Sequence, residues 1–290
     1  MAQAPRTSSF LTGDRLAADP GNVARDAVGI SPGDAEGTGW ALAARMRDIA
    51  PCWTVRSHDL LGSTNDEASD QARQGAPDRT VVWARAQTAG RGRRGRTWAS
   101  PEGNLHVSVL LRGVGPTAPQ LGFVAALAVA DAVDEVCETA RARLKWPNDV
   151  LLDGAKLAGV LLEVEQTPYG VATILGIGVN VRYFPLDASY PATSLRVHGF
   201  EVSVDAMLAH VLATLGSHLD QWMREGFDRV RSEWALRGHR RGDGLKINAP
   251  LGRKVFGRFA GLDDDGSLLA LVDGAVERFS AAEIIMPTAL

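Results

Sequence analysis

The sequence predicts an α+β protein in which a central mixed β-sheet is flanked by helices and followed by a small C-terminal β domain. Two observations predict this class. Helical and strand patterns alternate from about residue 53 to residue 238. After Gly238 the apolar runs become short and are separated by turn signals, as in an all-β module. We therefore expect an N-terminal extension over residues 1–50, a main domain over 51–238 and a C-terminal domain over 239–290.

The N-terminal extension has little patterning. Residues 1–38 contain few bulky apolar side chains and no sustained period, which predicts a largely disordered segment. Residues 40–49 are compatible with a short helix. A DNA-binding winged helix needs a longer patterned segment with basic recognition residues, and there is little room for one before Trp53. We expect no specific DNA binding.

The elements of the main domain alternate in type along the chain. Ser63, Thr64 and Asn65 begin a polar helix that Gly75 ends, and acidic residues follow in its first turn. Asp153-Gly154 separates two apolar runs and predicts a β-hairpin. The other predicted elements are strands at 80–86, 104–111 and 173–181, a buried helix at 120–137 and one helical stretch at 203–237.

The C-terminal module reads as four short strands, at 245–247, 255–259, 268–272 and 275–279. Asp265-Gly266 and Asp273-Gly274 supply turn residues between them. The predicted arrangement is a small barrel.

Composition excludes several classes of protein. The chain carries 31 basic and 34 acidic residues, a net charge of −3, so no overall positive field draws it to nucleic acid or to an anionic membrane. Its 2 cysteines have no zinc or redox spacing. The most apolar stretch, residues 123–130, is too short to span a bilayer, and no signal-peptide core is present at the N-terminus. We expect a cytoplasmic protein without membrane association.

One loop is unusually rich in arginine and glycine. Arg91, Arg93, Arg94 and Arg96 alternate with Gly90, Gly92 and Gly95. Glycine permits close approach of a ligand, and arginine presents donors that match phosphate and carboxylate groups. The glycines also satisfy the dinucleotide pattern Gly-x-Gly-x-x-Gly, but the residues that follow include a proline and a glycine where that motif requires a helix. The loop is therefore a candidate clamp for an anionic ligand.

Three further segments carry polar chemistry. The block Lys145-Trp146-Pro147-Asn148-Asp149 presents a cation, an amide and a carboxylate side by side. Lys156 lies just past the predicted hairpin turn, in an otherwise apolar strand. Gly176, Gly178 and Asn180 share one strand face, where the glycines either allow close packing or leave room for a ligand.

Taken in this order, the arginine loop, the Lys145–Asp149 block and Lys156 resemble those of the biotin–protein ligase family, in its monofunctional form without a DNA-binding domain. These enzymes adenylate biotin and attach it to a carrier domain. The resemblance covers about residues 57–181 and extends more loosely into the C-terminal module. It implies a catalytic fold like that of class II aminoacyl-tRNA synthetases, with an SH3-like C-terminal domain. It also implies ATP and biotin as substrates, Mg²⁺, and a biotin carboxyl carrier domain as the acceptor.

The resemblance implies two groups of residues on the biotin side. The first would hold the ureido ring and comprises Ser63, Thr64, Asn65 and Gln87. The second would close over the biotin carboxylate and the adenylate phosphate and comprises Arg91, Gly92 and Arg93.

On the nucleotide side, the resemblance places Trp98 near the adenine and Asn148, Asp149 and Asn180 around the nucleotide. Lys156 would contact the reacting carboxylate and phosphate oxygens. Because two anions are brought together in this reaction, Arg93 and Lys156 would offset their repulsion. Asp149 is a candidate to orient or accept the proton of the acceptor lysine, and capping the turn after Pro147 is an equally open role for it.

Two other functions compete with this interpretation. A lipoate–protein ligase has related chemistry, but it is expected to carry a different arginine motif and no Lys-Trp-Pro-Asn-Asp block. A nucleic-acid-binding module would use the arginine loop and the C-terminal barrel, and the acidic balance argues against it. His106 departs from the family, where Tyr or Phe is common, and this affects the expected local packing. The edge strands of the central sheet offer a surface for a homodimer.

Overall fold

The computed structural model of the protein describes residues 52–137, 139–280 and 282–285. The predicted N-terminal extension, including the helix expected at 40–49, lies outside the described residues.

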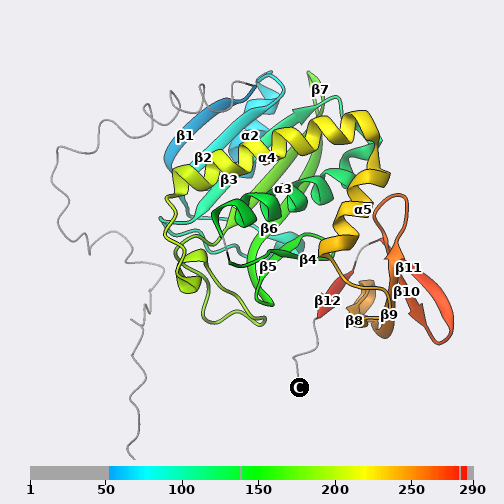
Figure 1. The fold of residues 1–290 in the computed structure, drawn as a ribbon. Helices are drawn as coiled ribbons and strands as arrows, with labels where there is room; N and C mark the ends of the chain where they lie inside the picture. The colour runs from blue at the N-terminus through cyan, green and yellow to red at the C-terminus, as the bar shows by residue number, and fades with distance from the viewer. Residues whose placement is uncertain (1–51, 138, 281, 286–290) are drawn as a thin grey trace, which may run out of the picture. The chain divides into compact units, whose positions relative to one another are not determined.

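The main part of the fold is a mixed seven-stranded sheet with strand order β1-β2-β3-β7-β6-β5-β4 (Figure 1). Strands β1 and β2 pair in parallel, and the other neighbours are antiparallel. The strands are β1 (Thr54–Leu61), β2 (Thr80–Gln87), β3 (Leu105–Arg112), β4 (Arg143–Lys145), β5 (Asp149–Leu152), β6 (Ala155–Thr167) and β7 (Gly170–Val179). The predicted mixed sheet and α+β class are confirmed.

The helices cover the two faces of this sheet unequally, because alternate strand residues point to opposite sides. On β2, Val81 and Trp83 join the large core that also contains α3 and α4, whereas Val82 packs with residues of α2. Figure 1 shows α3 and α4 lying across one face of the sheet. The helices are α2 (Thr64–Arg73), α3 (Leu121–Val136), α4 (Val204–Glu225) and α5 (Phe227–Arg237).

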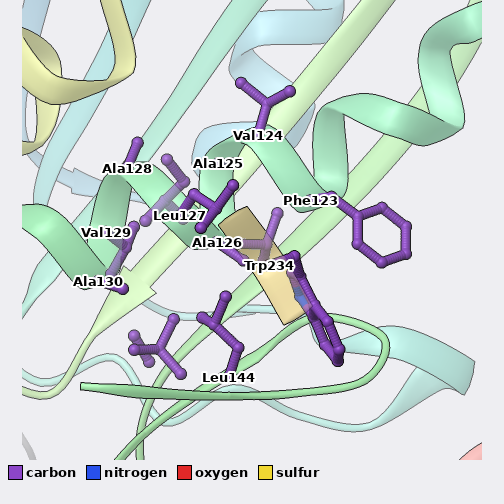
Figure 2. Packing of buried hydrophobic residues seen from close by; sticks show 14 of the residues in the cluster. Phe123, Val124, Ala125, Ala126, Leu127, Ala128, Val129, Ala130, Leu144 and Trp234 are labelled. Atoms are coloured by element: carbon purple, nitrogen blue, oxygen red, sulfur yellow. The ribbon is translucent and has the colours of Figure 1, made fainter. Parts of the chain in front are cut away.

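Helix α3 is almost entirely apolar because it is surrounded by other elements. Its side chains, from Phe123 to Ala130, pack toward Leu144 and Trp234 (Figure 2). Within the described residues, Gly115–Val136 is long and apolar enough to cross a membrane by length and composition alone. However, 67% of its most apolar window is buried inside this protein. Packing in the core accounts for its composition.

Three local predictions differ from the structure. The helical stretch expected at 203–237 is two helices, because Gly226 has a φ of 76° and ends α4. Strand β1 was not predicted, since its sequence TVRSHDLL is mostly polar and it lies at the edge of the sheet. Strand β4 was not predicted either, because its three residues are too few to show a period.

The C-terminal part is a five-stranded antiparallel sheet with strand order β11-β10-β9-β8-β12. Its strands are β8 (Gly244–Asn248), β9 (Lys254–Leu262), β10 (Leu268–Val272), β11 (Ala275–Phe279) and β12 (Glu283–Ile285). The four predicted strands and both predicted turns are present, and β12 is additional. Asp273 and Gly274 both have positive φ, as a tight hairpin turn requires.

The two sheets are joined by buried contacts. The indole nitrogen of Trp146 donates a hydrogen bond of 2.9 Å to the carbonyl oxygen of Gly266 in the C-terminal part. Phe123 and Trp234 pack edge to face, and Trp234 contacts Phe259 of β9. Apolar residues of both sheets therefore belong to one core. The domain boundary at residues 238 and 239 stays a prediction.

Candidate active site

The site is built on a row of five residues that crosses the sheet and has two glycines at its centre. Ala84, His106, Gly178, Gly159 and Asp149 lie directly opposite one another on β2, β3, β7, β6 and β5. Directly paired residues share a face, so these five residues form one continuous row. The row presents a flat floor in its middle and titratable side chains at both sides.

The indole of Trp98 lies on this floor. A Cβ atom added to Gly178 would lie 2.5 Å from the Trp98 ring, and one added to Gly159 would lie 3.3 Å from it. The third strand glycine, Gly176, allows the same close approach to Asn65, whose Oδ1 would lie 2.2 Å from an added Cβ. The glycines thus allow the side chains of other predicted site residues to pack against the sheet.

Above the floor is a cavity of about 470 Å³. Every residue that the sequence placed in the site lines this cavity: Ser63, Thr64, Asn65, Gln87, Arg91, Gly92, Arg93, Trp98, Asn148, Asp149, Lys156 and Asn180. They come from elements far apart in the sequence. The structure therefore brings the predicted residues together, while their individual roles stay predictions.

The arginine loop is a closed turn in the structure. The backbone N–H of Gly92 donates to the carbonyl oxygen of Arg96 at 2.7 Å, and Arg91 and Thr97 form a β-bridge. Arg94 and Gly95 both have positive φ, which the glycine adopts without strain. The salt bridge between Arg96 and Glu283 of β12, at 2.7 Å, links the loop to the C-terminal sheet.

Arg91 and Arg93 have different surroundings. Arg91 forms salt bridges with Asp66 at 2.6 Å and Glu163 at 3.2 Å, and the hydrogen bond with Asp66 is the main reason that its pKa is raised. Arg93 donates to the amide oxygen of Asn148 at 3.2 Å, and burial, followed by repulsion from Arg94, lowers its pKa. A guanidinium remains charged at neutral pH. Arg93 is therefore the half-buried cation best placed to receive an anion.

Lys156 is held by one carboxylate and two aromatic rings. Its ammonium lies 2.5 Å from Oδ1 of Asp149, whose Oδ2 lies 3.5 Å from Lys145. The same ammonium lies 5.5 Å from the ring centroid of Trp98 and 5.2 Å from that of Tyr190. Such contacts fix the position of a flexible side chain. Because Asp149 contacts two ammonium groups, its geometry favours orienting Lys156.

The polar residues around α2 form a connected network. The backbone N–H of Thr64 donates to Oε1 of Gln87 at 2.7 Å, and Nε2 of Gln87 donates to Ser100 at 2.8 Å. Ser63 occupies the N-cap position of α2 with extended backbone angles, but its side chain makes no capping hydrogen bond. The predicted start of the helix at these residues agrees with the structure, and the start of α2 is stabilised without the Ser63 hydroxyl.

Asn180 is a structural link as well as a lining residue. Its Nδ2 donates to the carbonyl oxygen of Thr193 at 3.0 Å. Its backbone N–H donates to the carbonyl oxygen of Leu157 at 2.9 Å. These bonds hold the segment after β7 against the start of β6. Tyr190 lies in that segment and was not predicted, because an isolated tyrosine in a loop has no sequence signal.

His106 is buried in the wall of the cavity, with 1% of its surface exposed. Its Nε2 donates to the carbonyl oxygen of Pro101 at 3.2 Å, while Nδ1 has no hydrogen-bond partner in the described residues. Burial lowers its pKa. The departure from the usual aromatic residue thus places a buried imidazole beside the glycine floor.

Within the described residues, no group of three or more His, Cys, Asp or Glu side chains is arranged to hold a metal ion. A protein cage for a cation is therefore not seen in that part of the chain. Mg²⁺ commonly binds through substrate phosphates and only one or two carboxylates.

The comparison with known families defines the class of protein to which this fold and site belong, the biotin and lipoate protein ligases. The model of the biotin/lipoate A/B protein ligase family matches residues 59–180, and that of the biotin protein ligase C-terminal domain matches residues 244–286. The chain belongs to this family of biotin protein ligases, and the C-terminal sheet is its SH3-like domain.

Individual relatives agree with this assignment. The biotin–[acetyl-CoA-carboxylase] ligase of Paracoccus denitrificans is 38% identical over 235 residues, which cover 77% of this chain and 96% of that protein. The corresponding ligase of Mycobacterium tuberculosis is 35% identical, over 77% of this chain and 85% of its own length. The biotin protein ligase of Aquifex aeolicus in complex with biotin and ATP is similar in structure, with a TM-score of 0.70 and 28% identity, over 80% of this chain and 97% of that chain.

Proposed function

We infer that this protein is an ATP-dependent biotin–protein ligase, which forms biotinyl-5′-adenylate and transfers biotin to a lysine of a carrier domain. The observation that carries the inference is the single cavity in which the arginine loop, the Lys156–Asp149 pair and the polar residues around α2 meet. The relatives named as biotin ligases, which span nearly this whole architecture, support it.

In the first step, an oxygen of the biotin carboxylate attacks the α-phosphorus of ATP. A new P–O bond forms, the bond to the β-phosphate oxygen breaks, and pyrophosphate leaves. Arg93 and Lys156 are proposed to stabilise the charge that accumulates between the two anions. Lys156 is suited to this role because Asp149, Trp98 and Tyr190 hold its ammonium in place.

In the second step, the neutral amine of the acceptor lysine attacks the acyl carbon of biotinyl-5′-adenylate. An amide forms, AMP leaves and one proton is released. We propose that Asp149 acts mainly by orienting Lys156, because its two oxygens already contact two lysine ammonium groups. The closed arginine loop is proposed to exclude water from the adenylate until the acceptor arrives.

We further propose that the acceptor is the biotin carboxyl carrier domain of a carboxylase, as the names of the relatives suggest. Magnesium would enter with ATP, where it neutralises phosphate charge. Homodimerisation and a cytoplasmic location stay predictions from the sequence.

The test is pyrophosphate release, or ATP–pyrophosphate exchange, with biotin, with lipoate or with no acid, followed by transfer to a biotin carrier domain. We expect turnover with biotin and a labelled acceptor. Turnover with lipoate instead would assign the other branch of the family. If neither acid is activated, the proposed function is wrong, and binding of RNA should then be measured over a range of salt concentrations.

A further inference from the structure

Two side chains behind the cavity, Ser108 and Glu163, connect the residues expected to hold the ureido ring. Glu163 Oε2 accepts a hydrogen bond of 2.6 Å from Nδ2 of Asn65. The hydroxyl of Ser108 contacts Oδ1 of Asn65 at 2.6 Å and Oγ1 of Thr64 at 2.8 Å. Thr64 in turn contacts Gln87. A continuous chain therefore runs from β6 through α2 and β3 to β2.

The donors and acceptors along this chain follow from the number of available hydrogens. A carboxylate only accepts, so Glu163 requires the amide nitrogen of Asn65 to face it. The amide oxygen of Asn65 then faces Ser108 and has no hydrogen of its own. Ser108 has one hydroxyl hydrogen, which is needed for Asn65. Toward Thr64, Ser108 can therefore only accept.

The remaining contacts leave acceptors near the ligand. Because Ser108 can only accept toward Thr64, their 2.8 Å contact requires the hydroxyl hydrogen of Thr64 to point at Ser108 and not at Oε1 of Gln87, which lies 3.1 Å away and accepts the backbone N–H of Thr64. Unused lone pairs are then left on Thr64 and Gln87, both of which line the cavity. The ureido ring of biotin presents two N–H donors, and this polarity is complementary to those lone pairs.

We propose that Ser108 and Glu163 are positioning residues that set the hydrogen-bond polarity of the ureido pocket. Neither residue lines the cavity, and each acts through Asn65 or Thr64. Ser108 is fully buried, so no solvent replaces a lost bond. The inference rests on the proposed biotin ligase function and adds the residues that determine recognition of the ureido group.

The experiment is biotin-dependent ATP–pyrophosphate exchange with Ser108→Ala, Glu163→Gln and the double variant. Each single variant is expected to raise the KM for biotin roughly tenfold. Ser108→Ala removes the donor to the buried amide oxygen of Asn65, and Glu163→Gln replaces an obligate acceptor with an amide that can present either its oxygen or its NH2 group to Asn65. The KM for ATP should stay within about twofold of the wild-type value, since this series of hydrogen bonds does not reach the nucleotide side of the cavity. The double variant should raise the KM for biotin by less than the product of the two single effects, because both changes act through Asn65.

Two matched controls separate this role from general effects. Glu165→Gln is the same change two residues further along β6, where Glu165 pairs with Arg73 at 2.7 Å and lies outside the cavity lining. Asp66→Asn removes the other carboxylate of Arg91 and leaves the Asn65–Glu163 bond intact. Both controls should raise the KM for biotin less than Glu163→Gln raises it. Thermal unfolding of each variant should show that it is folded.

The outcomes distinguish the two levels of the argument. Wild-type protein without biotin-dependent exchange would overturn the proposed ligase function and this inference with it. Active wild type with an unchanged biotin KM in the variants would overturn only the inference. An equal effect of either control, equal rises in both KM values or independent effects in the double variant would also overturn it.

Discussion

Replacing Gly178 with alanine tests whether the flat floor positions Trp98. The added Cβ would lie 2.5 Å from the indole, whereas ordinary contact begins at 3.4 Å. The ring must therefore move by roughly 1 Å. Because the ring is only partly buried, it can swing toward the cavity, and the displacement will disturb its contact with Lys156 at 5.5 Å.

The magnitude follows from typical overpacking costs. Forcing an extra methyl group into a packed site costs about 1–3 kcal/mol, which corresponds to a loss of roughly 5- to 150-fold in kcat/KM for ATP if it acts on the bound state. Alanine in a strand interior is itself more stable than glycine by about 0.5–1 kcal/mol. We therefore expect a large loss of adenylation with little change in the midpoint of thermal unfolding.

The assay is ATP–pyrophosphate exchange at saturating biotin, with unfolding followed by circular dichroism. Gly159→Ala gives a graded comparison, because its Cβ would lie 3.3 Å from the same ring and should cost less. Gly122→Ala is the outer control, since no atom lies within 4 Å of its added Cβ. Wild-type kcat/KM for ATP in Gly178→Ala would refute the idea that the floor sets the position of Trp98.

Three further predictions concern charge. Arg93→Gly should increase release of biotinyl-adenylate about tenfold, measured as labelling of non-cognate lysines, because a charge-assisted contact is lost; unchanged release would refute the clamp. Lys156→Ala should slow adenylation by about 100-fold while the affinity for biotin, measured by calorimetry, changes little. An equal loss of biotin affinity and of adenylation rate would indicate that Lys156 only binds the substrate. Burial lowers the pKa of His239 to about 4. The unfolded chain therefore takes up this proton at higher pH than the folded one, and the unfolding free energy should fall by about 3 kcal/mol as pH drops from about 6.5 to 4. His239→Phe should flatten that fall in urea titrations, and an unchanged slope would contradict the assignment.

Local patterns were sufficient wherever a segment had one buried face or a characteristic turn. The hairpin at Asp153-Gly154 was predicted because positive φ at both residues suits aspartate and glycine. Helix α3 was predicted because a run of apolar residues needs burial. Strand β1 was missed, because a polar edge strand has no such pattern and forms through its pairing with β2.

The residues of the site also divide into those with a local sequence signal and those without one. The arginine loop and Lys156 carry local signals, since their charge stands out against glycine and against an apolar strand. Tyr190, Ser108 and Glu163 carry none, because an ordinary tyrosine, serine or glutamate gains its meaning only from what it contacts. The N-cap position of Ser63 is visible in the sequence, but the direction of its hydroxyl is decided only in the structure.

The sequence by itself determined the family, the order of most elements and the charged residues that line the site. These features depend on short-range patterns and on motifs with fixed spacing. Only the tertiary structure decided which neutral and buried groups complete the site. The row from Ala84 to Asp149 joins five strands through register, and register depends on pairing between segments far apart in the chain. The polarity of the ureido pocket likewise depends on which atoms share a hydrogen, and that is settled only when the strands and α2 pack together.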